Sequence, residues 1–175
     1  MRCLVTGGTG LVGSNLTLEL QKQGHEVIIT GHEAEQAMPE FQGKCLYPGL
    51  LGIDWNALKN VDVLFHQAAI NGTRVKDRAE IMRANYEASK ELFEFVLKNG
   101  CKKIVYASST AVYGNNPAPY FESDLPNPQT AYAESKKLLD DYAMELSSQR
   151  KDVTIVGLRY CNIYGPRENH KGTRA

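Results

Sequence analysis

The first thirteen residues place three glycines directly after a short apolar run. Leu4 and Val5 precede Gly7, Gly10 and Gly13 in the spacing G-x-x-G-x-x-G, and an amphipathic stretch follows. This order predicts a strand, a tight turn and the N-terminus of a helix. Such a turn can bind a pyrophosphate, because backbone N–H groups and the helix dipole converge there and no Cβ blocks the approach. The start of the chain therefore indicates a dinucleotide site.

Strand-like and helix-like segments alternate along the rest of the chain. Repeated alternation of this kind requires crossover helices on both faces of a mostly parallel sheet. We therefore predict an α/β, doubly wound, Rossmann-type fold with six strands, formed by a single domain over residues 1–175. The expected strands are Arg2–Thr6, Glu26–Thr30, Lys44–Tyr47, Val61–His66, Lys103–Ala107 and Val153–Leu158. The expected helices are Gly10–Gln23, Trp55–Lys59, Arg78–Asn99 and Thr130–Ser148.

Composition narrows the classes of partner and location. Lys+Arg and Asp+Glu number 20 each, so no broad basic surface for nucleic acid or anionic lipid is expected. No apolar run approaches the roughly 20 residues that cross a bilayer, and no apolar leader opens the chain, so we expect a cytoplasmic protein. The cysteines form no C-x-x-C pair and no His cluster accompanies them; we predict no metal site and interpret all four as small core residues in a reducing compartment: Cys3, Cys45, Cys101 and Cys161.

The end of the second expected strand bears on the choice of cofactor. Gly31 stands where an NAD site usually has Asp or Glu to accept hydrogen bonds from the adenosine ribose. Without a carboxylate there, a 2′-phosphate is not repelled, and His32 follows directly as a candidate contact. Glu33 favours NAD if the turn brings its carboxylate back towards the adenosine ribose. NADP is slightly favoured.

A second signature lies far downstream, in Tyr132 and Lys136. Their spacing places both on one face of a helix, although most pairs of this kind are ordinary surface pairs. An ammonium beside a phenol lowers the pKa of the phenol and yields a base for a sugar hydroxyl. Upstream, Ser108, Ser109 and Thr110 place hydroxyls at the carboxyl end of a strand, where ligands bind in open α/β sheets. Such a serine can hydrogen-bond a reacting oxygen, or it can simply cap the strand end; no G-x-S-x-G elbow supports a serine nucleophile.

Taken together, these motifs resemble the extended short-chain dehydrogenase/reductase family, and within it the NAD-dependent epimerases and dehydratases of nucleotide sugars. The last matching segment is most similar to the ADP-glycero-manno-heptose 6-epimerases. The segments that carry the resemblance occur in the family's order: Thr6–Gly13, Phe65–Ala69, Ala107–Gly114, Tyr132–Lys136 and Leu158–Gly172.

The resemblance implies a role for each matching residue. Tyr132 and Lys171 would be the acid/base residues for the two faces of the sugar, and Ser109 would polarise the reacting oxygen while contacting substrate. Lys136 would bind the nicotinamide ribose and tune the tyrosine, and Asn162 would contact the substrate. One tightly bound NADP or NAD per chain is implied, held by Gly7, Gly10, Leu11, Val12, Gly13, His32, Ala68, Ala69, Asn85, Tyr132, Lys136 and Ile163.

The implied activity is that of an isomerase: epimerisation of a nucleotide sugar by transient oxidation and reduction with bound NAD(P), with an ADP-heptose as the expected substrate. A UDP-hexose 4-epimerase is the alternative, and mainly His170 and Lys171 favour the heptose epimerase over it. A 4,6-dehydratase is disfavoured, because Thr110 and Ala111 stand where it would carry an acidic pair after Ser109. A cofactor-binding module without turnover is the alternative outside the enzymes.

Members of the family continue well beyond this length, with a last sheet strand and a small C-terminal region that covers the substrate. We therefore expect the nucleotide-binding domain to be incomplete at its C-terminus and the substrate region to be missing. We expect this chain to bind the cofactor more readily than it catalyses turnover, because an open site loses electrostatic preorganisation and substrate positioning. The family also implies a homo-oligomer, paired through the helices Arg78–Asn99 and Thr130–Ser148.

Overall fold

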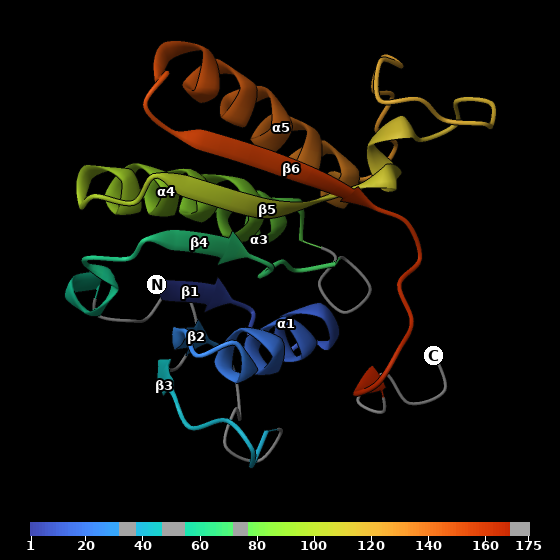
Figure 1. Ribbon diagram of the computed structural model, residues 1–175. Helices are drawn as coiled ribbons and strands as arrows, with labels where there is room; N and C mark the ends of the chain where they lie inside the picture. Colours follow the sequence, from blue (N-terminus) through green and yellow to red (C-terminus); the bar gives the residue numbers. More distant parts are fainter. Residues whose placement is uncertain (32–37, 47–54, 72–76, 169–175) are drawn as a thin grey trace.

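The computed structural model describes residues 1–31, 38–46, 55–71 and 77–168. Within these residues six strands form one parallel sheet in the order β3-β2-β1-β4-β5-β6 (Figure 1). This is the Rossmann strand order, which confirms the predicted α/β class. The strands are β1 (Arg2–Thr6), β2 (Glu26–Thr30), β3 (Lys44–Leu46), β4 (Val63–His66), β5 (Lys103–Ser109) and β6 (Thr154–Tyr160).

The helices follow the predicted segments with differences in detail. The expected helix over 78–99 is interrupted by a π-helical stretch, η3, and the short one after residue 54 is a 3₁₀ turn, η2. The strands β5 and β6 each run two residues further than predicted, which brings their ends closer to the functional residues. The helical elements are α1 (Leu11–Lys22), η2 (Trp55–Leu58), α3 (Arg78–Met82), η3 (Arg83–Glu87), α4 (Ala88–Lys98), η4 (Thr110–Tyr113) and α5 (Ala131–Gln149).

Both faces of the sheet are packed, as a doubly wound fold requires. Successive residues of a strand point to opposite faces. Cys3 and Val5 of β1 pack in a cluster with Leu20 of α1, whereas Leu4 belongs to a second cluster with Phe93 of α4 and residues of α5. Figure 1 shows α1 on one side of the sheet and α3, α4 and α5 on the other. The glycine turn before α1 and the helix α5, which carries Tyr132, therefore approach the sheet from opposite faces.

The face that α1 covers ends in exposed apolar side chains at β6. The register pairs Val5 with Phe65, Phe65 with Val105, and Val105 with Val156, so these residues share the α1 face. Val156 is 41% exposed on this face, and Leu158, two residues further, is 38% exposed. This edge of the sheet presents apolar surface.

A buried histidine joins the carboxyl ends of two central strands to the helix behind them. His66 Nδ1 lies 2.7 Å from Thr6 Oγ1, and His66 Nε2 lies 2.8 Å from Ser89 Oγ. Because Ser89 Oγ donates its proton to the Asn85 carbonyl at 2.8 Å, the imidazole proton belongs on Nε2 and Nδ1 accepts from Thr6. Burial, with a smaller effect from nearby Lys136, lowers the pKa of His66 to about 3. The ring is therefore neutral at neutral pH.

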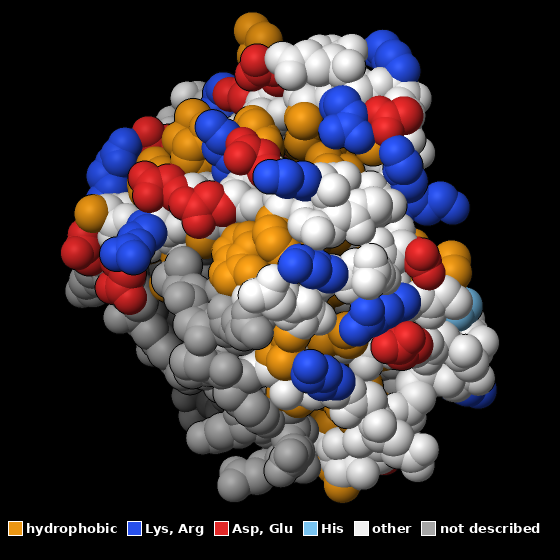
Figure 2. Space-filling model, turned by 90° about the vertical axis from the view of Figure 1, so that its left-hand side faces the viewer, with side chains coloured by type: hydrophobic (Ala, Val, Ile, Leu, Met, Phe, Trp, Pro, Cys, Tyr) orange, Lys and Arg blue, Asp and Glu red, His pale blue; other side chains and the backbone are white. Residues whose placement is uncertain are grey.

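The distribution of charged side chains and the burial of the cysteines bear on the expectations from composition. Figure 2 shows acidic and basic side chains interspersed on one face, with hydrophobic side chains between them. Among the described helices, none has both the length and the apolar character that a membrane crossing requires. Cys3 and Cys101 are buried as predicted and Cys45 is half-buried. The core interpretation is wrong for Cys161, which is exposed because it follows the last residue of β6.

We expect His66 to make stability fall in acid. Its pKa is about 3 when folded and about 6.5 when unfolded, so the unfolded chain binds more protons between these values and the free energy of unfolding decreases as pH drops through this window. His66→Gln should flatten this dependence by up to about 1.4 kcal/mol per pH unit. Urea unfolding from pH 7 to pH 4 measures it, with His25→Gln as the matched histidine control. Equal slopes in the two variants would contradict the prediction.

Candidate functional site

A cavity of about 760 Å³ opens at the carboxyl ends of the strands, between β1 and the β4–β6 half of the sheet. In open α/β sheets this is where ligands bind, and the volume is typical of small-molecule sites. The structure brings most of the predicted site residues to its wall: Gly7, Gly10, Leu11, Val12, Gly13, Ala69, Ser109, Tyr132, Lys136, Asn162 and Ile163. Ser108, one of the expected strand-end hydroxyls, also lines the cavity, and the remaining lining residues were not predicted: Gln67, Asn71, Ala107, Tyr160, Cys161, Tyr164 and Glu168.

The glycine turn forms one end of this cavity. Gly7 has φ +66°, and a Cβ there would lie 2.8 Å from the Ala68 nitrogen. A Cβ on Gly13 would lie 2.1 Å from the Gly7 carbonyl oxygen, so helix α1 can approach the turn this closely only with glycine. Gly10 is the N-cap of α1 and makes no side-chain cap, which leaves first-turn N–H groups to bind an anion. The turn therefore fits the pyrophosphate of a dinucleotide.

The missing carboxylate at the end of β2 has a packing reason. A Cβ on Gly31 would lie 2.5 Å from Thr9 Oγ1, so a side chain at this position would require the Thr9 side chain to shift. Glycine there does not by itself indicate NADP. His32 and Glu33, the other residues of that argument, lie outside the described residues.

Lys136 is the most deeply buried charge of the site. It lies in α5, whose N-terminus is capped by the Thr130 hydroxyl accepting from the Ala133 N–H at 3.1 Å. The Lys136 side chain is 1% exposed, and its Nζ donates to the Ala107 carbonyl at 2.7 Å. Burial lowers its pKa to about 8, and the charge of Asp140 opposes this. The helix thus presents an ammonium to the cavity at neutral pH.

Tyr132 and Ser109 meet beside this lysine. Ser109 lies close enough to the Tyr132 hydroxyl to lower its pKa, and Lys136 Nζ lies 5.8 Å from the centroid of the Tyr132 ring. Ser109 Oγ also accepts from the Ala111 N–H at 3.1 Å, so it is both a strand-end cap and a member of the site. The predicted lowering of the Tyr132 pKa is wrong for the side chains as they stand. Burial raises that pKa, and the hydrogen bond from Ser109 opposes the rise only in part.

Two predicted cofactor residues lie behind the cavity wall. The Asn85 side chain accepts from the Ile70 N–H at 2.7 Å, donates to the Ile70 carbonyl at 2.8 Å, and donates to Ser135 Oγ at 3.2 Å. Ala68 N–H donates to Thr6 Oγ1 at 3.3 Å. These contacts shape the loop after β4. The predicted contacts His32 and Lys171 lie outside the described residues.

Gln67 and Tyr160 form a part of the cavity wall that the sequence motifs did not predict. Burial raises the pKa of Tyr160, and the nearby Gln67 side chain opposes this in part. Gln67 Oε1 is buried and has no hydrogen-bond partner among the described residues, so it is an acceptor available to a bound ligand. Both residues stand at or just after strand ends, so the rule that ligands bind at these ends was the signal for them.

Comparison with known proteins relates this geometry to function. The NAD dependent epimerase/dehydratase family matches residues 3–175. An ADP-L-glycero-D-manno-heptose-6-epimerase from Helicobacter pylori is 33% identical, with a TM-score of 0.88, over 99% of this chain and 59% of that chain.

Two further solved structures belong to 4-epimerases. A UDP-N-acetylglucosamine 4-epimerase from Methanobrevibacter ruminantium is 29% identical, with a TM-score of 0.86, over 99% of this chain and 59% of that one. A UDP-glucuronic acid 4-epimerase from Bacillus cereus, in complex with NAD, is 27% identical, with a TM-score of 0.84, over 96% of this chain and 59% of that one. The chain therefore spans less than two thirds of the length of these structures.

We expect two glycine substitutions in the turn to separate ligand binding from folding. A Cβ on Gly10 meets only the Gly7 carbonyl oxygen, at 3.3 Å, so Gly10→Ala should fold but crowd the approach of a pyrophosphate. Gly13→Ala should lose stability, because its Cβ would collide with the backbone at 2.1 Å. Calorimetric titration with NAD+ and thermal melts measure the two effects. Gly10→Ala binding NAD+ as tightly as the wild type would contradict the assignment of this turn.

Proposed function

This chain belongs to the NAD dependent epimerase/dehydratase family, and from this premise we propose that it forms the nucleotide-binding part of a nucleotide-sugar epimerase that works by transient oxidation and reduction of the sugar. One observation carries the proposal. Ser109, Tyr132 and Lys136 line the same cavity as the glycine turn of α1. Two hydroxyl groups and an ammonium thus lie within one dinucleotide-sized site.

The chain's own residues fit a dinucleotide. We propose that Gly7, Gly10 and the first turn of α1 bind the pyrophosphate, and that Lys136 binds the nicotinamide ribose. Gln67 Oε1, which has no partner among the described residues, is an acceptor on the same wall. When bound, the nicotinamide supplies a reversible acceptor for hydride.

Tyr132 is the proposed acid/base. As phenolate it takes the proton of the sugar hydroxyl while the hydrogen on the same carbon leaves as hydride, and the sugar becomes a carbonyl compound. Ser109 donates a hydrogen bond to the reacting oxygen. Burial raises the pKa of Tyr132 and so disfavours the phenolate, and Ser109 opposes this in part. Were hydride then returned to the other face, epimerisation would be complete, and Lys171, outside the described residues, is the proposed acid for that face.

An ADP-heptose epimerised at C6″ is the proposed substrate. Its support is the 33% identity to a heptose 6-epimerase over nearly the whole of this chain. A UDP-hexose 4-epimerase is the second candidate, supported by the 4-epimerase structures of similar TM-score. Incubation of the full-length protein with ADP-heptose, UDP-glucose and UDP-N-acetylglucosamine, followed by NMR of the sugars, distinguishes the two. NAD+ binding without conversion of any of them would favour a binding module.

We expect Tyr132→Phe to abolish turnover and to spare cofactor binding. Loss of a positioned acid/base group typically costs 10²–10⁴-fold in rate, and the phenyl ring preserves the packing of α5. Initial rates and calorimetric NAD+ affinity in the full-length protein measure this. Tyr120→Phe, which removes the hydroxyl of a 43% exposed tyrosine, is the matched control. Turnover of Tyr132→Phe within about tenfold of that control would refute the role of the tyrosine.

A further inference from the structure

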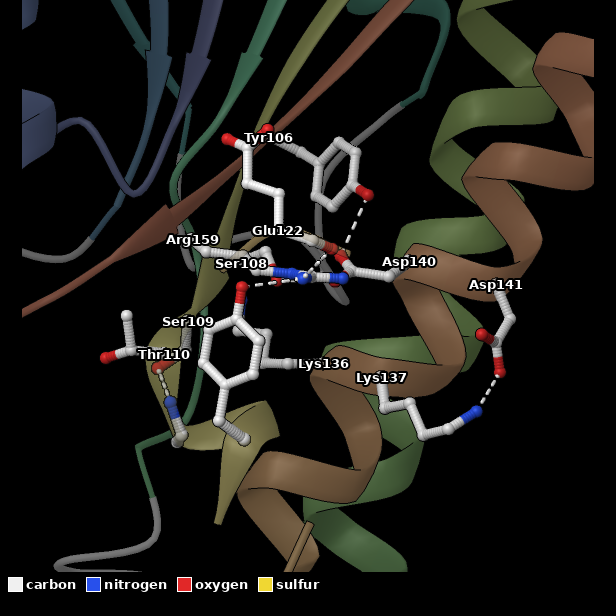
Figure 3. A network of polar contacts seen from close by, with 12 residues as sticks. Tyr106, Ser108, Ser109, Thr110, Glu122, Lys136, Lys137, Asp140, Asp141 and Arg159 are labelled. Carbon is white, nitrogen blue, oxygen red and sulfur yellow. Dashed lines mark hydrogen bonds and ion pairs between the residues drawn. The ribbon is translucent and has the colours of Figure 1, made fainter. Parts of the chain in front are cut away.

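Asp140 is a buried carboxylate outside the cavity wall, and it binds three donors. It lies on α5 one turn beyond Lys136 and is 6% exposed. Its Oδ1 accepts from the Tyr106 hydroxyl at 2.8 Å, and its Oδ2 accepts from Ser108 Oγ at 2.9 Å and Arg159 Nε at 3.3 Å. Figure 3 shows Asp140 directed at these side chains of β5 and β6. The carboxylate therefore ties α5 to both strands.

The contacts between α5 and β5 form a ladder with three rungs. Tyr132 lies beside Ser109, and Lys136 Nζ donates to the Ala107 carbonyl. Asp140 then accepts from Ser108 and from Tyr106, the residue before Ala107. Residues four apart on the helix thus hold the last four residues of β5. The third rung restricts sliding of α5 along β5, which would separate Tyr132 from Ser109.

The same carboxylate faces the buried ammonium. Lys136 is surrounded by Tyr132 and Asp140 of α5, His66 of β4 and, through Asp140, by Tyr106 of β5 and Arg159 of β6. His66 is neutral, because burial lowers its pKa to about 3. Asp140 is the one carboxylate among the buried described residues. Its charge opposes the lowering of the Lys136 pKa by burial, and its direct ion pair is with Arg159, from Nε to Oδ2 at 3.3 Å.

We propose that Asp140 is a positioning residue for the Tyr132–Lys136 pair: it holds α5 in register on the end of β5 and balances the Lys136 ammonium. Its effect on turnover rests on the proposed function. Its effect on the ionisation of Lys136 and on the end of β5 does not.

The neighbouring carboxylate provides a matched control. Asp141 turns away from the strands and pairs with Lys137, four residues before it on the surface of α5 (Figure 3). Its side chain is 45% exposed. Asp140→Asn and Asp141→Asn remove the same charge from adjacent positions, and only the first removes it from the ladder.

Titration of Lys136 in the full-length protein tests the charge. The signal of its side-chain nitrogen is followed by NMR from pH 6 to 10 in the wild type and both variants. In Asp140→Asn the midpoint should fall by at least about one pH unit, a tenfold change in the acid constant, because burial then acts without the opposing carboxylate. In Asp141→Asn it should stay near the wild-type value. Equal midpoints in the two variants would overturn the charge role.

Tyr106→Phe tests the ladder even where Asp140→Asn does not fold. It removes the donor to Oδ1, keeps the ring, and changes no residue of the cavity wall. We expect roughly fivefold faster amide exchange at Ala107–Ser109 and a similar loss of turnover at unchanged NAD+ affinity, as loss of one such hydrogen bond typically gives. Unchanged exchange would overturn the positioning role. If Tyr106→Phe exchanges these amides faster but the wild type converts no nucleotide sugar, the positioning role of Asp140 is upheld. The proposed function is then contradicted.

Discussion

The ammonium of Lys136 is charged, and protein covers almost all of it, so the cavity depends on how that charge is held. Removal of an ion from water is costly unless hydrogen bonds and an opposite charge compensate. The Ala107 carbonyl supplies the first and Asp140 the second. Because both partners are fixed by the pairing of α5 with β5, the position of Tyr132 one turn earlier is fixed with them.

The opposite side of the site depends on backbone rather than on charge. Gly7 and Gly13 allow α1 to approach the strand ends more closely than any side chain would permit. His66, with hydrogen bonds to Thr6 and Ser89, joins the ends of β1 and β4 to the helix behind the sheet. Helices from opposite faces thus meet at one cavity, as the strand order requires.

Patterns local in the chain predicted the fold well. Apolar runs and glycines placed the strands, and the G-x-x-G-x-x-G spacing placed the first turn. The chain's motifs also named Ser109, Tyr132 and Lys136, which the structure brings to one cavity wall. Sequence spacing could not give the pKa direction of Tyr132, because burial depends on the packing of α5 against the sheet. The motifs likewise did not predict Gln67 as an acceptor in the cavity wall, because this wall forms from strands that are distant in the sequence.

The far wall is formed by the segment after β6. Asn15 of α1 donates to the Pro166 carbonyl at 2.9 Å, and Arg167 pairs with Glu40, so this segment returns across the sheet to the α1 side. Asn162 and Ile163 lie on the same segment, and both line the cavity. Pairing of two chains through the helices Arg78–Asn99 and Thr130–Ser148 stays a prediction.

We propose that one dinucleotide spans the glycine turn and the Tyr132–Lys136 pair. NMR of the full-length protein titrated with NAD+ tests this most directly, through NOEs from the nicotinamide protons. We expect NOEs to the Tyr132 ring, together with shifts of the Gly7, Gly10 and Gly13 amides, at one shared affinity. Shifts of the glycine amides with the nicotinamide protons distant from Tyr132 would contradict it.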